Sequence, residues 1–112
     1  MLDRDYFEHT NPEGHDFDSR YSAAGYNCKI DIGYAYSLGG ENIYLNWTFE
    51  SRYVGGGIAE YKTQEAVVSS TVDGWMNSPG HRKNILNPNW NNEGIGVAIE
   101  PNGKILITQD FC

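Results

Sequence analysis

The sequence predicts one α+β domain, because helical and strand periodicities follow one another along the chain. Apolar residues recur at helical spacing between Thr63 and Met76. Residues 94–100 then alternate as a strand, and residues 105–111 return as its partner after a turn at 101–104. A length of 112 residues fits a single domain, and no internal repeat or second domain is visible.

The first quarter of the chain predicts a helix end, a turn and a short helix. Residues 1–7 are typical of the last turn or two of a helix. Asn11-Pro12-Glu13-Gly14 is a strong turn signal. Residues 16–24 predict a short helix, with an aspartate as its cap and Gly25 as its stop.

Residues 30–61 carry weaker patterns. The Tyr and Ile content of residues 30–37 suits either a strand or an ordered loop, which Gly39-Gly40 ends. Residues 41–47 are typical of an extended segment. Residues 51–61 contain Gly55-Gly56-Gly57 and therefore predict a loop.

Two consecutive helices and a hairpin complete the chain. Thr63 is a good N-cap for the first helix. Ser78 predicts the cap of a second, short helix that runs to about Leu86, with Pro79 in its first turn. In the hairpin, Asn102-Gly103 predicts a type I′ turn, because that turn requires positive φ angles.

Charge and cysteine content exclude several classes of function. The net charge is −7, which disfavours nucleic acid or an anionic membrane as the main partner. No apolar run reaches the length of a transmembrane segment, and no signal-peptide pattern is present. Cys28 and Cys112 form no CxxC motif, so a thiolate zinc site is excluded. A secreted protein would join them, whereas a cytosolic one would keep two thiols. Asn46-Trp47-Thr48 is a glycosylation sequon.

Five fragments, in order, resemble the CAP superfamily in its prokaryotic, SCP-like form (the cysteine-rich secretory protein, antigen 5 and pathogenesis-related group). They are Tyr6–Gly14, Gly40–Ile43, Trp75–Leu86, Gly94–Ala98 and Thr108–Phe111. The resemblance implies an α-β-α sandwich with a central, mostly antiparallel sheet. Since the family carries an earlier helical segment, residues 1–112 are interpreted as a single CAP domain that is incomplete at its N-terminus.

The resemblance also implies a site. His9, Glu41 and His81 match cleft residues of the family, where two histidines bind a divalent metal, and a weak zinc site is expected. Taken singly, each histidine would more often be a hydrogen-bonded structural residue, and Glu41 an acid that binds backbone in a turn. Animal and plant members add a second acid after the helix tryptophan. Here none follows Trp75, and Glu60 or Glu93 are the alternatives.

The expected function is a non-enzymatic recognition or lipid-binding module, extracellular or at the cell surface. Its partner would be a small hydrophobic ligand, an extracellular protein or a cell-wall component. The alternative is a metal-dependent, peptidase-like hydrolase with Glu41 as base. A third possibility is a purely structural or adhesive module. Neither a GxSxG elbow nor HExxH is present.

Three structural expectations complete the interpretation. We expect Cys28 and Cys112 to form a disulfide that pins the last strand to the Cys28 loop. Asn42 is expected to be a framework residue, and Arg20, Trp75 and Arg82 to be architectural. Loss of an upstream helix would uncover apolar surface. The residues concerned are Leu2, Tyr6 and Phe7, Val67, Val72 and Trp75 of the middle helix, or Ile95, Val97 and Ile99 of the sheet.

Overall fold

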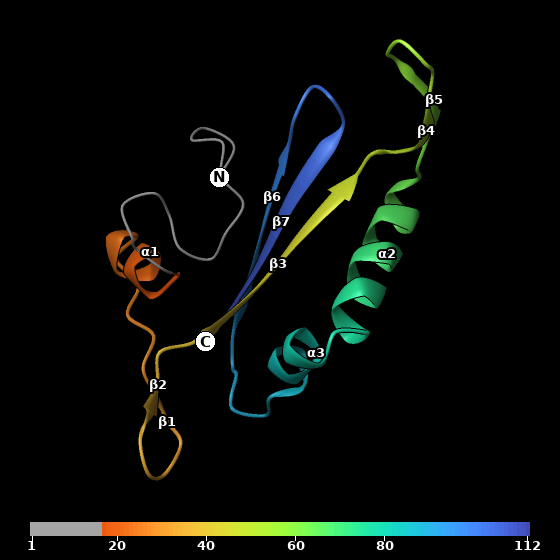
Figure 1. The fold of residues 1–112 in the computed structure, drawn as a ribbon. Coiled ribbons are helices and arrows are strands. Elements are labelled where there is room, and N and C mark those ends of the chain that lie inside the picture. Colours follow the sequence, from red (N-terminus) through yellow and green to blue (C-terminus); the bar gives the residue numbers. More distant parts are fainter. Residues whose placement is uncertain (1–16) are drawn as a thin grey trace.

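The computed structural model describes residues 17–112, and their side chains from Arg20 onward. Its centre is a three-stranded antiparallel sheet in the order β3-β7-β6 (Figure 1). These strands are β3 (Gly40–Trp47), β7 (Lys104–Phe111) and β6 (Glu93–Ile99). In this register Glu41 lies opposite Asp110, and Asn42 lies opposite Gln109.

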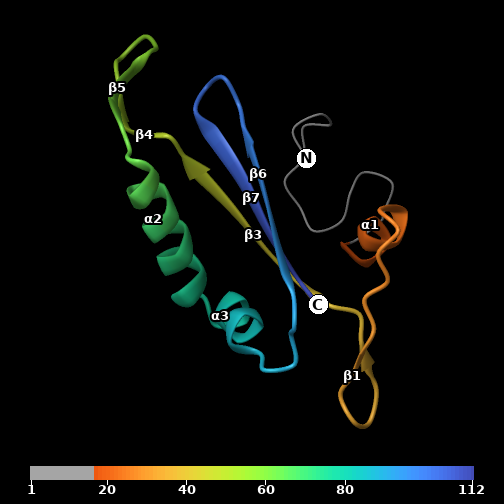
Figure 2. The same cartoon turned by 180° about the vertical axis from the view of Figure 1, so that it is seen from behind.

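Helices cover both faces of this sheet. α2 (Gln64–Met76) and α3 (Pro79–Leu86) lie on one side, and α1 (Phe17–Ala23) lies on the other (Figures 1 and 2). Because neighbouring residues of a strand point to opposite faces, Asn42 reaches α3 whereas Glu41 reaches α1. The arrangement confirms the predicted α+β class with an antiparallel sheet.

Local sequence accounts for how α1 and α2 begin and end. After α1, the N–H of Tyr26 donates to Tyr21 O (2.8 Å) and that of Gly25 to Ser22 O (3.0 Å), the paired bonds of a Schellman motif. At the start of α2, Thr63 Oγ1 accepts from the N–H of Ala66 at 3.1 Å. Both the stop at Gly25 and the cap at Thr63 are confirmed.

Two segments whose sequence patterns are weak form β-hairpins. β4 (Phe49–Arg52) pairs with β5 (Ile58–Tyr61), so the loop prediction for residues 51–61 is wrong. The three glycines form only its turn, and flanking residues on each side pair as strands. β1 (Ile30–Asp31) pairs with β2 (Tyr36–Ser37), which resolves the ambiguity of residues 30–37.

The turn between β6 and β7 also differs from the expected type I′ turn. Gly103 N donates to Glu100 O (2.9 Å), which places Pro101 and Asn102 at the centre of the turn. Gly103 follows with a φ of 92°, and Glu100 N donates to Lys104 O. This is the three-residue loop in which a β-turn is followed by a left-handed glycine. Proline fixes a negative φ at the first central position, and so excludes type I′.

The main apolar core lies between α2 and the sheet. Trp75, Ile105 and Ile107 are buried there, with Tyr44, Val67 and Ile85 packed against them. The indole N–H of Trp75 donates to Ile43 O at 3.1 Å. The core fixes α2 against β3 and thereby places α3, which follows after a short connection.

Candidate functional site

Glu41 lies at the α1 face of the sheet, in an ion pair. Glu41 is only 5% exposed, and Nη2 of Arg20 lies 2.8 Å and 2.6 Å from the two carboxylate oxygens of Glu41. Burial of a carboxylate is tolerated when a charged donor satisfies it. Arg20, expected to be architectural, therefore anchors α1 to β3 through the predicted site residue.

Asn42 points the other way and connects three elements. It is fully buried, and its Nδ2 donates to His81 O (3.2 Å) and to Gln109 Oε1 (3.1 Å). Asn84 Nδ2 donates to Asn42 Oδ1 at 2.9 Å. Gln109 Nε2 in turn donates to Glu93 Oε1 at 2.8 Å. The framework role of Asn42 is thus visible as a polar network that joins β6, β7, β3 and α3.

His81 is half-buried in the first turn of α3. Its Nδ1 lies 2.8 Å from Ser78 Oγ. Ser78 is the N-cap residue, but no cap bond from its side chain to the backbone is present in the described chain. The predicted cap bond is therefore wrong, because the hydroxyl is used to hold the imidazole.

The predicted metal cleft combines residues inside and outside the described chain. His9 lies outside the described residues, so its distance to His81 and Glu41 stays a prediction. Within residues 17–112, no three His, Cys, Asp or Glu side chains come together as metal ligands would. Those residues alone do not fit a metal ion, and Arg20 already binds the carboxylate of Glu41.

Of the two alternative acids, only Glu93 approaches this network. It is joined to Asn42 through Gln109. Glu60 lies on β5, at the other end of the sheet from α3 (Figure 1). Arg82 is exposed on α3.

Asp110 is an acid that the sequence interpretation did not single out. It lies opposite Glu41 on the neighbouring strand, so both side chains leave the same face of the sheet. A hollow of about 510 Å³ opens there, lined among others by Arg20, Tyr21 and Asp110. Asp110 lies in the fragment Thr108–Phe111, which resembles the family, and it points to the opposite face of the strand from Gln109. These two features of the sequence could have identified it.

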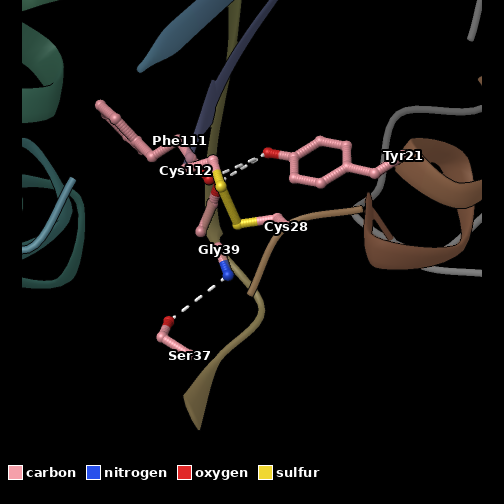
Figure 3. Close-up of a disulfide and its surroundings, with 7 residues drawn as sticks. Tyr21, Cys28, Ser37, Gly39, Phe111 and Cys112 are labelled. Carbon is pink, nitrogen blue, oxygen red and sulfur yellow. Dashed lines mark hydrogen bonds between the residues drawn. A yellow bond between two sulfur atoms is a disulfide. The ribbon is translucent and has the colours of Figure 1, made fainter. Parts of the chain in front are cut away.

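Tyr21 joins α1 to the ends of two strands (Figure 3). Its hydroxyl lies 3.3 Å from both Gly40 O and Phe111 O. Burial raises the pKa of Tyr21 well above its usual value, and the negative charges of Asp110 and Glu41 raise it further. Tyr21 therefore remains a neutral donor here.

The predicted disulfide lies beside Tyr21. Cys28 and Cys112 are bonded, with their Cα atoms 5.7 Å apart (Figure 3). Gly39 passes so close that a Cβ there would lie 2.5 Å from Phe111 O and 3.3 Å from Cys28 Sγ. Its φ of 107° also lies in the region that favours glycine. The bond ties the base of the β1–β2 hairpin to the end of β7.

A second candidate site is an apolar groove between α2 and the edge strand β6. Its volume is about 440 Å³. Ile95, Val97 and Ile99 of β6 remain 62%, 60% and 58% exposed. Of the residues expected to be uncovered, these three and Val72 are exposed, whereas Trp75 is buried and Val67 is half-buried. Leu2, Tyr6 and Phe7 lie outside the described residues, and the missing upstream helix stays a prediction. The remaining lining residues are Thr48, Tyr61, Lys62, Gln64, Val67, Val68, Thr71, Val72, Trp75, Ile105 and Ile107.

The sequon asparagine belongs to the interior. Asn46 is 4% exposed, and its Nδ2 lies 2.9 Å from both Ser70 Oγ and Thr71 Oγ1 of α2. Its Oδ1 accepts from Lys62 Nζ at 3.0 Å. In the folded domain this amide is inaccessible to a glycosylating enzyme.

An antiparallel sheet lies between helices, and a buried Glu-Asn pair is tied to a histidine-bearing helix, as the resemblance to SCP-like domains implies. The profile of the cysteine-rich secretory protein (CAP) family matches residues 1–111. The chain belongs to this family.

The chain is similar to part of a longer bacterial protein. "Uncharacterized protein YkwD" of Bacillus subtilis (strain 168) is 38% identical over 112 residues, which cover 99% of this chain and 32% of that protein. The chain thus spans about a third of this relative. No solved structure matches the chain at a significant level. No helix within residues 17–112 has the length and apolarity needed to cross a membrane.

Proposed function

We propose that this CAP domain is a non-enzymatic recognition module, secreted or at the cell surface, that holds an apolar ligand between α2 and β6. The groove carries this proposal. Its volume of about 440 Å³ falls within the range of small-molecule sites, about 300–1,000 Å³, whose walls are mostly apolar.

The energetic argument rests on exposed side chains. Fully burying a Val, Leu or Ile side chain is worth about 1.5–3 kcal/mol. Three such side chains on β6 and two on α2 are at least 45% exposed along the groove: Ile95, Val97, Ile99, Val68 and Val72. A ligand that covers them gains a large part of this free energy, which is why a long acyl chain is the expected occupant.

A titration with a fluorescent long-chain fatty acid tests the proposal. Val72→Asp places a charge in the groove at a residue that is already 45% exposed, so this variant is expected to fold. We expect its affinity to fall about tenfold or more, because a buried unpaired charge is costly. Val54→Asp, at the fully exposed turn of the β4–β5 hairpin, is the matched control and should bind like the wild type. Equal binding by both variants, or no binding by the wild type, would contradict the proposal.

The second candidate remains a metal-dependent hydrolase built on His9, His81 and Glu41. One observation favours it: Ser78 holds Nδ1 of His81, which leaves Nε2 as the nitrogen for a further partner. Metal-binding histidines commonly have their other nitrogen fixed in this way. The ion pair with Arg20 argues against Glu41 as a base.

Replacing both histidines separates the two candidates. If His9→Ala/His81→Ala abolishes a hydrolytic activity, the enzyme is supported. If fatty-acid capture is unchanged, the binding module is supported. A zinc titration belongs to the same experiment, and one weak site that both substitutions remove would support the proposed metal cleft.

A further inference from the structure

The turn between β6 and β7 contains a chemically labile pair of residues. Of all the asparagines in the sequence, Asn102 alone is followed by glycine. The side-chain carbonyl of an asparagine is open to attack by the backbone nitrogen of the next residue, and a glycine there has no Cβ to obstruct the attack. Asn102 is exposed, whereas Asn42 and Asn46 are buried in the domain. Asn102 is therefore the asparagine best placed for this reaction.

Hydrogen bonds act on both reacting groups of this pair. Oδ1 of Asn102 accepts from the N–H of Lys104 at 3.0 Å. A donor at this oxygen favours the attack, because it stabilises the negative charge that develops on the oxygen. The N–H of Gly103, however, donates to Glu100 O at 2.9 Å, and Gly103 O accepts from the N–H of Thr48 at 2.8 Å. The side-chain carbonyl is thus prepared in the closed turn, whereas the attacking nitrogen is held by the hairpin.

We propose that Asn102 is a site of spontaneous modification, where isoaspartate forms each time an opened turn lets the Gly103 nitrogen react. This nitrogen bonds to Cγ of Asn102, and the Cγ–Nδ2 bond breaks. The proton of the Gly103 amide passes through water to the departing nitrogen, which leaves as ammonia. Water then opens the five-membered succinimide at either of its two carbonyls. One product is aspartate, and the other is isoaspartate, whose main chain runs through the side-chain methylene.

Isoaspartate does not fit this turn, because it adds one carbon atom to the main chain. The three-residue loop depends on two backbone bonds, from Gly103 N to Glu100 O and from Glu100 N to Lys104 O. The bond from Thr48 N to Gly103 O also ties the turn to the end of β3. A longer main chain cannot keep all three bonds, and the new carboxylate adds to a net charge that is already −7. The modification therefore loosens the hairpin that carries the central strand β7, and it does so without an enzyme or a ligand.

Ageing the purified domain in a mildly alkaline buffer tests the proposal. Peptide mass spectrometry measures deamidation at each asparagine, and labelling by an isoaspartyl methyltransferase identifies the isoaspartate. We expect Asn102 to react first, and about tenfold more slowly in the folded domain than in urea, because the turn has to open. Asn92 is the internal control, since it is also exposed and lies in the same tryptic peptide but precedes a glutamate.

The consequence for stability is tested with a variant that cannot lose ammonia. After ageing, the wild type should melt about 4 °C or more below the fresh protein, whereas Asn102→Ser should melt as before. Earlier reaction at Asn92, or an intact Asn102 in the folded domain, would overturn the proposed site. Equal rates in the folded and unfolded protein would overturn the requirement for turn opening. An unchanged melting temperature of the isoaspartate form would overturn the loosening of the hairpin.

Discussion

Strands β3 and β7 bury polar side chains, whereas the neighbouring edge strand β6 exposes apolar ones. Asn42 and Gln109 are nearly inaccessible, while Val97, on the same sheet, is more than half exposed. Ordinary domains bury apolar groups first. The buried amides are tolerated because each one is hydrogen-bonded. The polar end of the sheet, around Asn42 and Gln109, is therefore hydrogen-bonded within the domain, whereas the apolar edge strand β6 gains most from an added partner.

Of the changes considered, breaking the disulfide is expected to lower the stability of the domain most. Cys28 and Cys112 are separated by 84 positions. In the chain-entropy model, closing such a loop is worth about 4–5 kcal/mol, as an upper figure. Cys28→Ser/Cys112→Ser should therefore lower the free energy of unfolding by up to this amount in urea melts. A reductant should reproduce the loss in the wild type and change nothing in the variant. An unaltered melt after verified reduction would contradict the expectation.

Asn42→Ala should be the most harmful single change in the polar network. It leaves polar groups of Gln109 and Asn84 unpaired in the interior, at a cost of about 3 kcal/mol. Val97→Ala, on the exposed edge, should change stability by about 0.5 kcal/mol or less. Urea melts of both variants measure the difference. Similar losses in the two would mean that the polar end is no more critical than the groove.

The N-cap residues of α2 and α3 should differ in how much they contribute to stability. Thr63→Ala removes a side-chain cap bond and should cost about 1 kcal/mol. Ser78→Ala removes no such bond and should cost less than about 0.5 kcal/mol. Ser78→Ala should instead alter the NMR signals of the His81 ring. A loss at Ser78 as large as that at Thr63 would show that the hydroxyl does cap α3.

Tyr21→Phe should have a small effect on stability, and one that depends on pH. The contacts of its hydroxyl with Gly40 O and Phe111 O are long for hydrogen bonds, so we expect a loss of about 0.5–1 kcal/mol near pH 8. The raised pKa of Tyr21 means that the unfolded chain ionises first as pH rises past about 10. The wild type then loses stability that the variant never had, so the two unfolding curves should converge above pH 10. Parallel curves up to pH 11 would contradict the assignment.

Local chemistry made much of the fold predictable. Thr63 and Gly25 act through neighbours in sequence, and period-two alternation marked the final hairpin. The β4–β5 pairing escaped prediction because three glycines dominated the local pattern while the strand signal lay on both sides of them. The type I′ turn was predicted wrongly because the Asn-Gly signal was weighed without Pro101. This proline fixes a negative φ one residue before Asn102.

Candidate site residues could be named from the sequence only where the family fragments mark them. Glu41, Asn42 and His81 were named this way, whereas the residues that they contact come from other segments. That Arg20 binds Glu41, and that Ser78 bonds the imidazole and not the backbone, depends on tertiary packing. The hydrogen bond from Lys62 to Asn46 gave no signal in the sequence either, because it depends on how the segment before α2 lies along β3.

Burial of Asn46 has a consequence for how the protein should be produced. In a eukaryotic secretory pathway the sequon would be presented on the nascent chain before α2 has folded over it. A glycan attached at that moment would occupy the space of Ser70 and Thr71 and prevent helix docking. Glycosylation and folding would then compete for the same amide, and the secreted yield would depend on which occurs first. A bacterial periplasm, which forms disulfides without this competition, is the better expression host.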